Sequence, residues 1–320
     1  MTDRPLAAII LAAGQGTRMK SATHKVLHPI AGKPMLHHLL DTVDSIGVER
    51  TVIVVGARRE QIEESVAGRN VAIAVQEEQL GTGHAVAQAH DALKGFAGDV
   101  LILYGDVPMV SADTMREMIF RLNNGSDHAG AYGRIIADEQ GEIEKMVEYK
   151  DASHEERGIN LCNSGLMAAR STDLFILLDQ ISNDNAAGEY YLPDIVMLPG
   201  QKSAVIEVDD PAEVAGVNSR AELAVVEGEW QARRRERAMA DGVSLIAPDT
   251  VWFSSDTEIA ADVVIEPNVI FGPGVSIASG ATIYGHSHIE GAKIGAHAKV
   301  GPFARLRPGS VMEEGSKIGN

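Results

Sequence analysis

A glycine-rich stretch near the amino terminus carries basic side chains at a spacing that could bind a polyphosphate. Gly14, Gly16 and Arg18 alternate along it, and Lys25 follows shortly after. Glycines allow conformations in which successive backbone N–H groups point into one hollow that suits phosphate oxygens, and the two basic side chains add positive charge. The spacing fits neither the dinucleotide-binding G-x-G-x-x-G motif nor the Walker motif. On spacing alone, the stretch could also be an ordinary turn.

An acidic side chain at the end of an apolar run is a candidate cation ligand. Asp106 follows the run of residues 100–104. A carboxylate there contributes little to packing, but it is well placed to hold a hard divalent cation beside phosphates. Asn218 is a candidate partner, because an amide oxygen binds Mg²⁺ without adding charge. Asp106 could instead be a turn residue, and Asn218 could cap the helix expected to begin at residue 220.

The first 218 residues predict the scaffold that these side chains need. Apolar runs rich in branched residues alternate with helix-like stretches, which is typical of βαβ units around a mostly parallel sheet. Such sheets bind ligands at the carboxyl ends of their strands, and the loops that carry Gly14 and Asp106 follow predicted strands. The strands are predicted at residues 6–13, 51–55, 71–75, 100–104 and 204–208, and the helices at residues 35–46, 82–93 and 114–122.

A hexapeptide repeat predicts a second domain over residues 243–320. Its apolar positions recur every six residues, with a single five-residue step between Ile289 and Ile294. A β-sandwich would alternate with period two, whereas this period is that of a left-handed parallel β-helix with three flat sides per coil. The eleven positions are Ile259, Ile265, Phe271, Ile277, Ile283, Ile289, Ile294, Val300, Leu306, Met312 and Ile318.

Residues 219–242 predict a linking helix that carries a short basic run. The arginines of this run are Arg233, Arg234, Arg235 and Arg237. The whole chain of 320 residues has 28 basic and 45 acidic residues, a net charge of −17. We therefore interpret the run as a solvated or intersubunit face rather than a nucleic-acid site.

Composition indicates a soluble globular protein without a targeting segment. The longest apolar run, residues 6–13, is too short to span a bilayer, and residues 1–5 lack the layout of a secretion signal. The single cysteine, Cys162, agrees with a reducing compartment. We expect a cytoplasmic protein that binds neither nucleic acid nor a membrane.

Several short motifs connect these features to a known family. The stretch from Gly14 to Pro34 resembles the G-x-G-T-R-M…K…G-K-P signature of the sugar-nucleotide pyrophosphorylases, whose catalytic domain is a Rossmann-like α/β fold. With further motifs, the chain resembles the bacterial family of bifunctional N-acetylglucosamine-1-phosphate uridyltransferases and glucosamine-1-phosphate acetyltransferases. The further motifs are Gln76 with residues 80–85, and residues 104–108, 132–135, 147–152, 163–165, 188–191 and 216–220.

The resemblance implies that residues 1–218 transfer UMP from UTP to N-acetylglucosamine 1-phosphate and release pyrophosphate. The attacking phosphate oxygen is already an anion, so the protein has to align the reactants and neutralise charge. Arg18 and Lys25 would neutralise the phosphates, and Asp106 with Asn218 would hold Mg²⁺. The catalytic residues implied are Arg18, Lys25 and Asp106.

The resemblance also implies two groups of substrate contacts. Gln76, together with backbone groups near Ala13, Gly14 and Gly81, would read uracil. Gly133, Glu148 and Asn163 would contact the sugar phosphate. Without the resemblance, Glu148 would be a solvated acid and Thr82 a helix cap. The full set of implied substrate-binding positions is Leu11, Ala12, Ala13, Gly14, Lys25, Gln76, Gly81, Thr82, Tyr104, Gly105, Asp106, Gly133, Glu148, Asn163, Asn218 and Arg307.

The chain departs from the family in two places. Pro193 stands where the family usually has threonine, so a hydroxyl contact to the sugar phosphate is lost. The repeat also stops at Asn320, before the family's catalytic histidine and coenzyme A contacts, although Arg307 matches an arginine of the glucosamine-phosphate site. We expect a truncated form that lacks acetyltransferase activity and forms a homotrimer through its β-helix.

Two other interpretations stay open. The chain could be a pyrophosphorylase for another sugar phosphate or nucleotide, because the glycine loop and the metal aspartate are shared across the superfamily. It could also be a non-catalytic regulatory subunit. Such a subunit is expected to have lost the metal ligand or the phosphate-binding cations, whereas Asp106, Arg18 and Lys25 are all present.

Overall fold

The computed structural model forms two compact units. It describes residues 4–124, 128–129, 134–137, 143–147, 152–159 and 161–319. The N-terminal unit consists of Met1–His28 and Met35–Ser219, and the C-terminal unit consists of Pro29–Pro34 and Arg220–Asn320. Among the helices in the described ranges, none is both long and apolar enough to cross a lipid bilayer.

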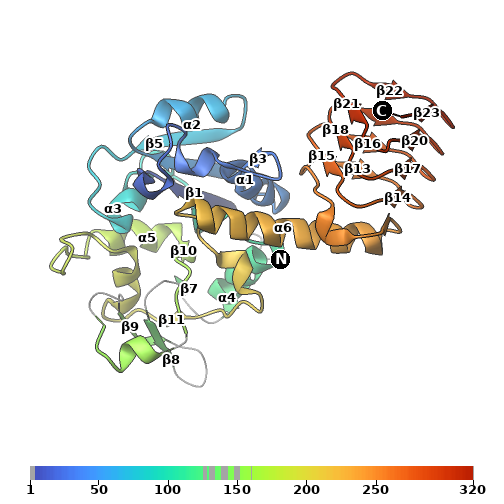
Figure 1. Cartoon of the computed structure of the whole chain (residues 1–320). Helices are drawn as coiled ribbons and strands as arrows, with labels where there is room; N and C mark the ends of the chain where they lie inside the picture. The colour runs from blue at the N-terminus through green and yellow to red at the C-terminus, as the bar shows by residue number, and fades with distance from the viewer. Residues whose placement is uncertain are drawn as a thin grey trace. The chain divides into compact units, whose positions relative to one another are not determined.

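A seven-stranded sheet forms the centre of the N-terminal unit, in the order β11-β7-β10-β6-β1-β4-β5 (Figure 1). Strand β1 pairs in parallel with β4 and β6, and β4 pairs in parallel with β5. The Rossmann-like α/β arrangement is therefore confirmed. The strands are β1 (Leu6–Ala12), β4 (Arg50–Val55), β5 (Val71–Val75), β6 (Asp99–Tyr104), β7 (His128–Ala129), β10 (Met167–Arg170) and β11 (Ser203–Ala204).

Helices cover both faces of this sheet because the side chains of its strands alternate between them. Along β1, Ile9 packs in a cluster with side chains of α3 and α5, whereas Ile10 packs in a cluster with those of α1 and α4. Both isoleucines are fully buried. The helices of this unit are α1 (Met35–Ser45), α2 (Arg59–Ser65), α3 (Thr82–Ala87), α4 (Ala112–Asn124) and α5 (Ser171–Leu178). Its 3₁₀-helices are η1 (Thr17–Met19), η2 (Lys25–Leu27), η3 (Glu156–Gly158), η4 (Leu192–Met197) and η5 (Pro211–Val214), and a separate pair of strands is β8 (Arg134–Ala137) and β9 (Ile143–Val147).

Two sequence predictions need correction in this unit. The strand predicted over residues 204–208 is limited to β11, because it pairs at the sheet edge with the two residues of β7. The helix predicted over residues 82–93 ends at Ala87, where the next N–H groups bond three residues back instead of four, as in Ala89 N to Val86 O at 3.0 Å. The prediction of a mostly parallel sheet is confirmed, although β10 runs antiparallel to β6 and β7.

The C-terminal unit is a long helix, α6 (Arg220–Ala240), followed by the predicted β-helix (Figure 1). Three sheets of parallel two-residue strands form its sides. The repeat positions stack on one another: Ile277 pairs with Ile259 and Ile294, and Ile294 pairs with Met312. The five-residue step therefore shortens one coil without breaking the register. The strands are β12 (Ser244–Leu245), β13 (Glu258–Ile259), β14 (Val264–Ile265), β15 (Ile270–Phe271), β16 (Ser276–Ile277), β17 (Thr282–Ile283), β18 (His288–Ile289), β19 (Lys293–Ile294), β20 (Lys299–Val300), β21 (Arg305–Leu306), β22 (Val311–Met312) and β23 (Lys317–Ile318), with one 3₁₀-helix, η6 (Pro248–Thr250).

Two of the α6 arginines contact the first coil of the β-helix. Arg234 lies over the Phe253 ring at 4.9 Å and donates to Thr257 O at 3.0 Å. Burial lowers the pKa of Arg234 from its usual value. Arg235 donates weakly to Val251 O. The expectation of a solvated face is thus wrong for Arg234 and Arg235, because their guanidinium groups contact the first coil of the β-helix.

A short hairpin from early in the sequence completes the C-terminal unit. It consists of β2 (Pro29–Ile30) and β3 (Lys33–Pro34). Its Ala31 N–H donates to the Glu227 carboxylate of α6 at 2.7 Å. The Ala31 carbonyl accepts from Ser255 N at 2.8 Å. Residues that directly follow η2 in the sequence thus belong to a different compact unit.

Candidate active site

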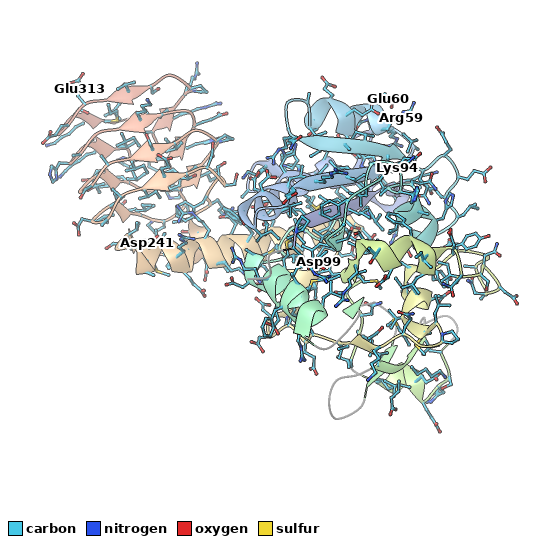
Figure 2. All side chains as sticks on the ribbon, turned by 180° about the vertical axis from the view of Figure 1, so that it is seen from behind. Arg59, Glu60, Lys94, Asp99, Asp241 and Glu313 are labelled. Atoms are coloured by element: carbon cyan, nitrogen blue, oxygen red, sulfur yellow. The ribbon has the colours of Figure 1, made fainter. Side chains whose placement is uncertain are left out.

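A pocket of about 570 Å³ opens in the N-terminal unit, where β1, β5 and β6 end at their carboxyl sides. This is the place where a parallel sheet binds ligands. Asp99, labelled in Figure 2, marks the opposite end of β6 from Asp106. The pocket is lined by Leu11, Ala12, Ala13, Gly14, Lys25, Val26, Gln76, Gln79, Gly81, Thr82, Ala85, Tyr104, Asp106, Val107, Glu189, Gly216 and Asn218.

Three polar side chains from distant parts of the sequence meet in this pocket. The ammonium group of Lys25 donates to Asp106 Oδ2 and, at 3.1 Å, to Asn218 Oδ1. The Lys25 and Asp106 side chains are only 12% and 14% exposed. Asp106 lies in the turn after β6, and its carbonyl accepts from Val217 N at 2.9 Å. Asp106 is therefore both a turn residue and part of the pocket. The side-chain oxygen of Asn218 faces Lys25.

Glycine is required at one point of the loop beside Lys25. Gly16 has φ +60°, in the left-handed region that favours glycine. A Cβ atom built there would lie 2.7 Å from Lys25 Cβ. The absence of a side chain at Gly16 thus leaves the space through which Lys25 reaches the pocket.

The segment before Lys25 is held by the start of α2. Gln61 accepts from His24 N at 2.7 Å and donates to Ala22 O at 3.0 Å. Arg58 donates to Ser21 O at 2.9 Å. His24 itself is buried, and burial, helped by the charge of neighbouring Lys25, lowers its pKa to about 4. Its imidazole is therefore neutral near pH 7 and adds no charge beside Lys25.

A network of amides lies at the other end of the pocket. The buried Gln76 amide nitrogen donates to Gly81 O and to His84 Nδ1, both at 3.1 Å. Gln79 donates from its amide nitrogen to Ala13 O at 2.6 Å. The oxygen of the Gln76 amide accepts from no group among the described residues.

Thr82 connects the start of α3 to η4. The N-cap of α3 is Gly81, so the interpretation of Thr82 as a simple cap is wrong. Its hydroxyl oxygen instead accepts from Leu192 N at 2.9 Å. Pro193 lies in the first turn of η4, where the missing N–H of proline costs nothing.

Some predicted site residues lie elsewhere. Arg18 is exposed and outside the pocket lining, and Gly105 lies behind the lining, donating from its backbone to Leu11 O at 2.9 Å. Arg307 is exposed on the β-helix in the C-terminal unit. Gly133 and Glu148 fall outside the described residues.

Asn163 is buried away from the pocket lining and has an unusual amide. Its Oδ1 accepts from Gly165 N at 2.9 Å. Its Nδ2 is buried and has no partner within the described ranges. Because an unpaired buried N–H₂ is costly, this group points to a ligand or to a group outside those ranges.

The pocket also contains residues that the sequence analysis did not single out. Gln79 and Glu189 supply polar groups, and Val26 and Val107 supply apolar surface. Glu189 belongs to one of the motifs used above, so the motif itself was a signal. Gln79 had no comparable signal, because a lone glutamine between motifs is usually a surface residue.

The oxygen donors in this pocket fit a hard divalent cation. Asp106 and Asn218 supply a carboxylate and an amide oxygen, and both are within reach of a single cationic group, the Lys25 ammonium. No cluster of three or more acidic, histidine or cysteine side chains in the described part of the chain could hold a metal. A cation bound here would therefore keep waters and take phosphate oxygens, as Mg²⁺ does in nucleotide sites.

Comparison with known proteins shows that most of the residues lining this pocket lie within one matched domain. Residues 8–151 match the MobA-like NTP transferase domain. The chain is 61% identical over 278 residues to the bifunctional protein GlmU of Rhizorhabdus wittichii, covering 82% of this chain and 61% of that protein. It is 58% identical over 275 residues to GlmU of Novosphingobium aromaticivorans (82% and 60% covered) and 53% identical over 276 residues to GlmU of Zymomonas mobilis (82% and 61%). The chain thus spans about three fifths of the length of these relatives.

Proposed function

We propose that this chain, which is similar to the bifunctional GlmU proteins and matches the MobA-like NTP transferase domain over residues 8–151, is a nucleotidyltransferase. Its domain of residues 1–218 transfers UMP from UTP to N-acetylglucosamine 1-phosphate and releases pyrophosphate. The reaction depends on Mg²⁺. The observation that carries the proposal is the meeting of Lys25, Asp106 and Asn218 in the pocket at the carboxyl end of the sheet.

These three residues are suited to phosphoryl-type transfer. Asp106 and Asn218 would hold the metal ion, which supplies positive charge to the nucleotide phosphates and to the departing pyrophosphate. The Lys25 ammonium is partly withdrawn from solvent, so its charge acts on nearby phosphate oxygens with little screening by water. The nucleophile is a phosphate anion, so the site needs no general base. What the chain contributes is alignment and charge neutralisation.

The base end of the pocket suits uracil. Gln76 presents its amide oxygen, an acceptor for the uracil N3–H group. The backbone N–H of Gly81 donates to no group among the described residues and can serve a uracil carbonyl. For the sugar phosphate, the buried Nδ2 of Asn163, which has no partner among the residues that the structure describes, supports a contact with an acceptor of the substrate.

The test is pyrophosphate release from UTP with and without Mg²⁺. N-acetylglucosamine 1-phosphate is compared with glucose 1-phosphate and glucosamine 1-phosphate as acceptors. We expect metal-dependent release that is selective for the first. Preference for another sugar phosphate would change the proposed substrate but not the proposed type of reaction. The absence of pyrophosphate release with any acceptor would favour a non-catalytic subunit.

A pair of aspartate variants separates the site from general stability. Asp106→Ala should reduce turnover by at least a hundredfold, because one of the two protein ligands for the cation is lost. Asp113→Ala is the matched control. Asp113 is almost fully exposed in α4, where it pairs with Arg116 at 2.8 Å, outside the pocket lining. Equal activity of the two variants would contradict the assignment of Asp106.

We further propose that the chain assembles as a homotrimer through its β-helix. The support is a set of exposed apolar side chains on that domain, including Ile270, Phe303 and Val311, which is 69% exposed. Light scattering coupled to gel filtration would measure the assembly, and a monomer at micromolar concentration would contradict it.

A further inference from the structure

We propose that His84 is a positioning residue that sets the choice of UTP over CTP by fixing the orientation of the Gln76 amide. The inference rests on the proposed function, since it assumes that the pocket binds a pyrimidine nucleotide. His84 itself is not part of the pocket lining. It would act through Gln76, which does line the pocket.

The orientation of the Gln76 amide follows from its two partners. The nitrogen faces the carbonyl oxygen of Gly81 and Nδ1 of His84, each at 3.1 Å. A carbonyl can only accept, so the group that faces Gly81 O has to be the amide NH₂. Both hydrogens of that NH₂ are then used, one on each partner. An amide turned by 180° would place its oxygen against the Gly81 oxygen.

Two amide groups flank the His84 ring. Nδ1 lies 3.1 Å from the Gln76 amide nitrogen and Nε2 lies 3.1 Å from the Gln88 amide nitrogen, and an imidazole can accept at only one of its nitrogens. In the proposed state, Nδ1 is the acceptor for Gln76. Gln88, whose amide nitrogen lies 3.1 Å from Nε2, holds the other side of the residue by donating to His84 O at 3.1 Å. Of the two acceptors that hold the Gln76 amide, His84 is the one that mutation can remove, since the other is backbone.

This arrangement leaves Gln76 as a pure acceptor toward the pocket. Uracil presents N3–H, a donor, beside a carbonyl, whereas cytosine presents N3 as an acceptor beside an amino group. The Gln76 oxygen can accept from the uracil N3–H, and a backbone donor such as Gly81 N–H can donate to the uracil carbonyl. With cytosine, the Gln76 oxygen would face the acceptor N3 and the backbone N–H would face the amino group, so neither hydrogen bond could form. If the amide could turn, its NH₂ group would accommodate cytosine and the discrimination would fall.

The experiment measures the dissociation constants of Mg²⁺-UTP and Mg²⁺-CTP by calorimetry, so that it does not depend on turnover. We expect the wild type to bind UTP at least tenfold more tightly than CTP. In His84→Ala, this ratio should fall about tenfold, because the second Gln76 hydrogen loses its acceptor and only the Gly81 carbonyl still opposes a turned amide. His84→Asn should stay within about threefold of the wild-type ratio, since its side-chain oxygen restores an acceptor near the former Nδ1.

Controls make each outcome decisive. His90→Asn changes an exposed histidine that contacts Phe175 outside this network, and it should keep the wild-type ratio. If His84→Ala does not fold, His84→Phe keeps a planar ring without an acceptor and replaces it. Two results would overturn the role of His84 and leave the proposed function intact. One is a wild-type affinity ratio in folded His84→Ala or His84→Phe. The other is a fall of the ratio in His84→Asn as large as in the variant without an acceptor. A wild type without preference for UTP overturns both.

Discussion

Lys25 donates a hydrogen bond from its ammonium group to the carboxylate of Asp106, 81 residues away in the sequence. The same ammonium also contacts Asn218. The lysine therefore occupies the two oxygens that we assign to the metal ion. A cation that binds there has to displace the ammonium, which is then free to turn toward the phosphates.

The first prediction concerns this competition. Lys25→Met should bind Mn²⁺ in the absence of nucleotide about tenfold more tightly than the wild type, because the cation no longer displaces a largely buried ammonium and meets no like charge. Turnover should nevertheless fall by at least a hundredfold, since the charge on the phosphates is lost. Electron paramagnetic resonance of free Mn²⁺ measures the affinity.

Lys94→Met is the control for Lys25→Met. Lys94, labelled in Figure 2, is exposed in the turns after α3 and lies outside the pocket lining. Its replacement should change neither Mn²⁺ affinity nor turnover. Unchanged or weaker Mn²⁺ binding by Lys25→Met would show that the ammonium and the cation do not share these oxygens.

The second prediction concerns the space beside Lys25. Gly16→Ala should lower the free energy of unfolding by about 1–2 kcal/mol, because alanine at φ +60° is strained. It should also reduce activity, because the new methyl group would lie 2.7 Å from Lys25 Cβ. Gly47→Ala separates the two effects: Gly47 has φ +78° and nothing within 4 Å of an added Cβ. We expect similar destabilisation and full activity in Gly47→Ala, measured by urea unfolding and pyrophosphate release.

The parts of the fold that could be predicted are those encoded by a local period. The six-residue spacing of Ile277 and Ile283 identifies the β-helix because every turn of that fold repeats the same short pattern. Apolar runs likewise identify the parallel strands, and the loops after β1 and β6 could be assigned to the site from topology alone.

The remainder depends on contacts between distant residues. The hairpin of Pro29–Pro34 joins the C-terminal unit through Glu227, almost two hundred residues later, and nothing in its own sequence indicates this. The contact between Thr82 and Leu192 is equally non-local. His84 lies in the motif of residues 80–85, but the motif alone does not show that its ring contacts the Gln76 side chain, which precedes the helix.

The third prediction concerns His24 and pH. Its pKa of about 4 in the folded protein is below the usual 6.5, so between these values the unfolded chain binds a proton that the folded protein does not. Stability therefore falls as the pH falls from 6.5 toward 4, by up to about 1.4 kcal/mol per pH unit from this group, and the group has no effect above that window. His24→Asn should flatten the pH dependence of the free energy of unfolding, whereas His90→Asn, at an exposed site, should not. Parallel curves for wild type and His24→Asn would contradict the role of His24.

The fourth prediction tests whether the buried Asn163 amide meets the sugar phosphate. Asn163→Asp keeps an oxygen to accept from Gly165 N but replaces the unpaired Nδ2 by a second oxygen. If Nδ2 donates to the substrate, the KM for N-acetylglucosamine 1-phosphate should rise at least tenfold, while the KM for UTP stays the same, because the pocket that holds Gln76 and Lys25 is unchanged. Asn183→Asp, at an exposed position, is the control, and a thermal melt of each variant checks the fold. If both KM values rise together, Asn163 supports the whole site structurally; if neither changes, its amide partner is within the protein rather than on the substrate.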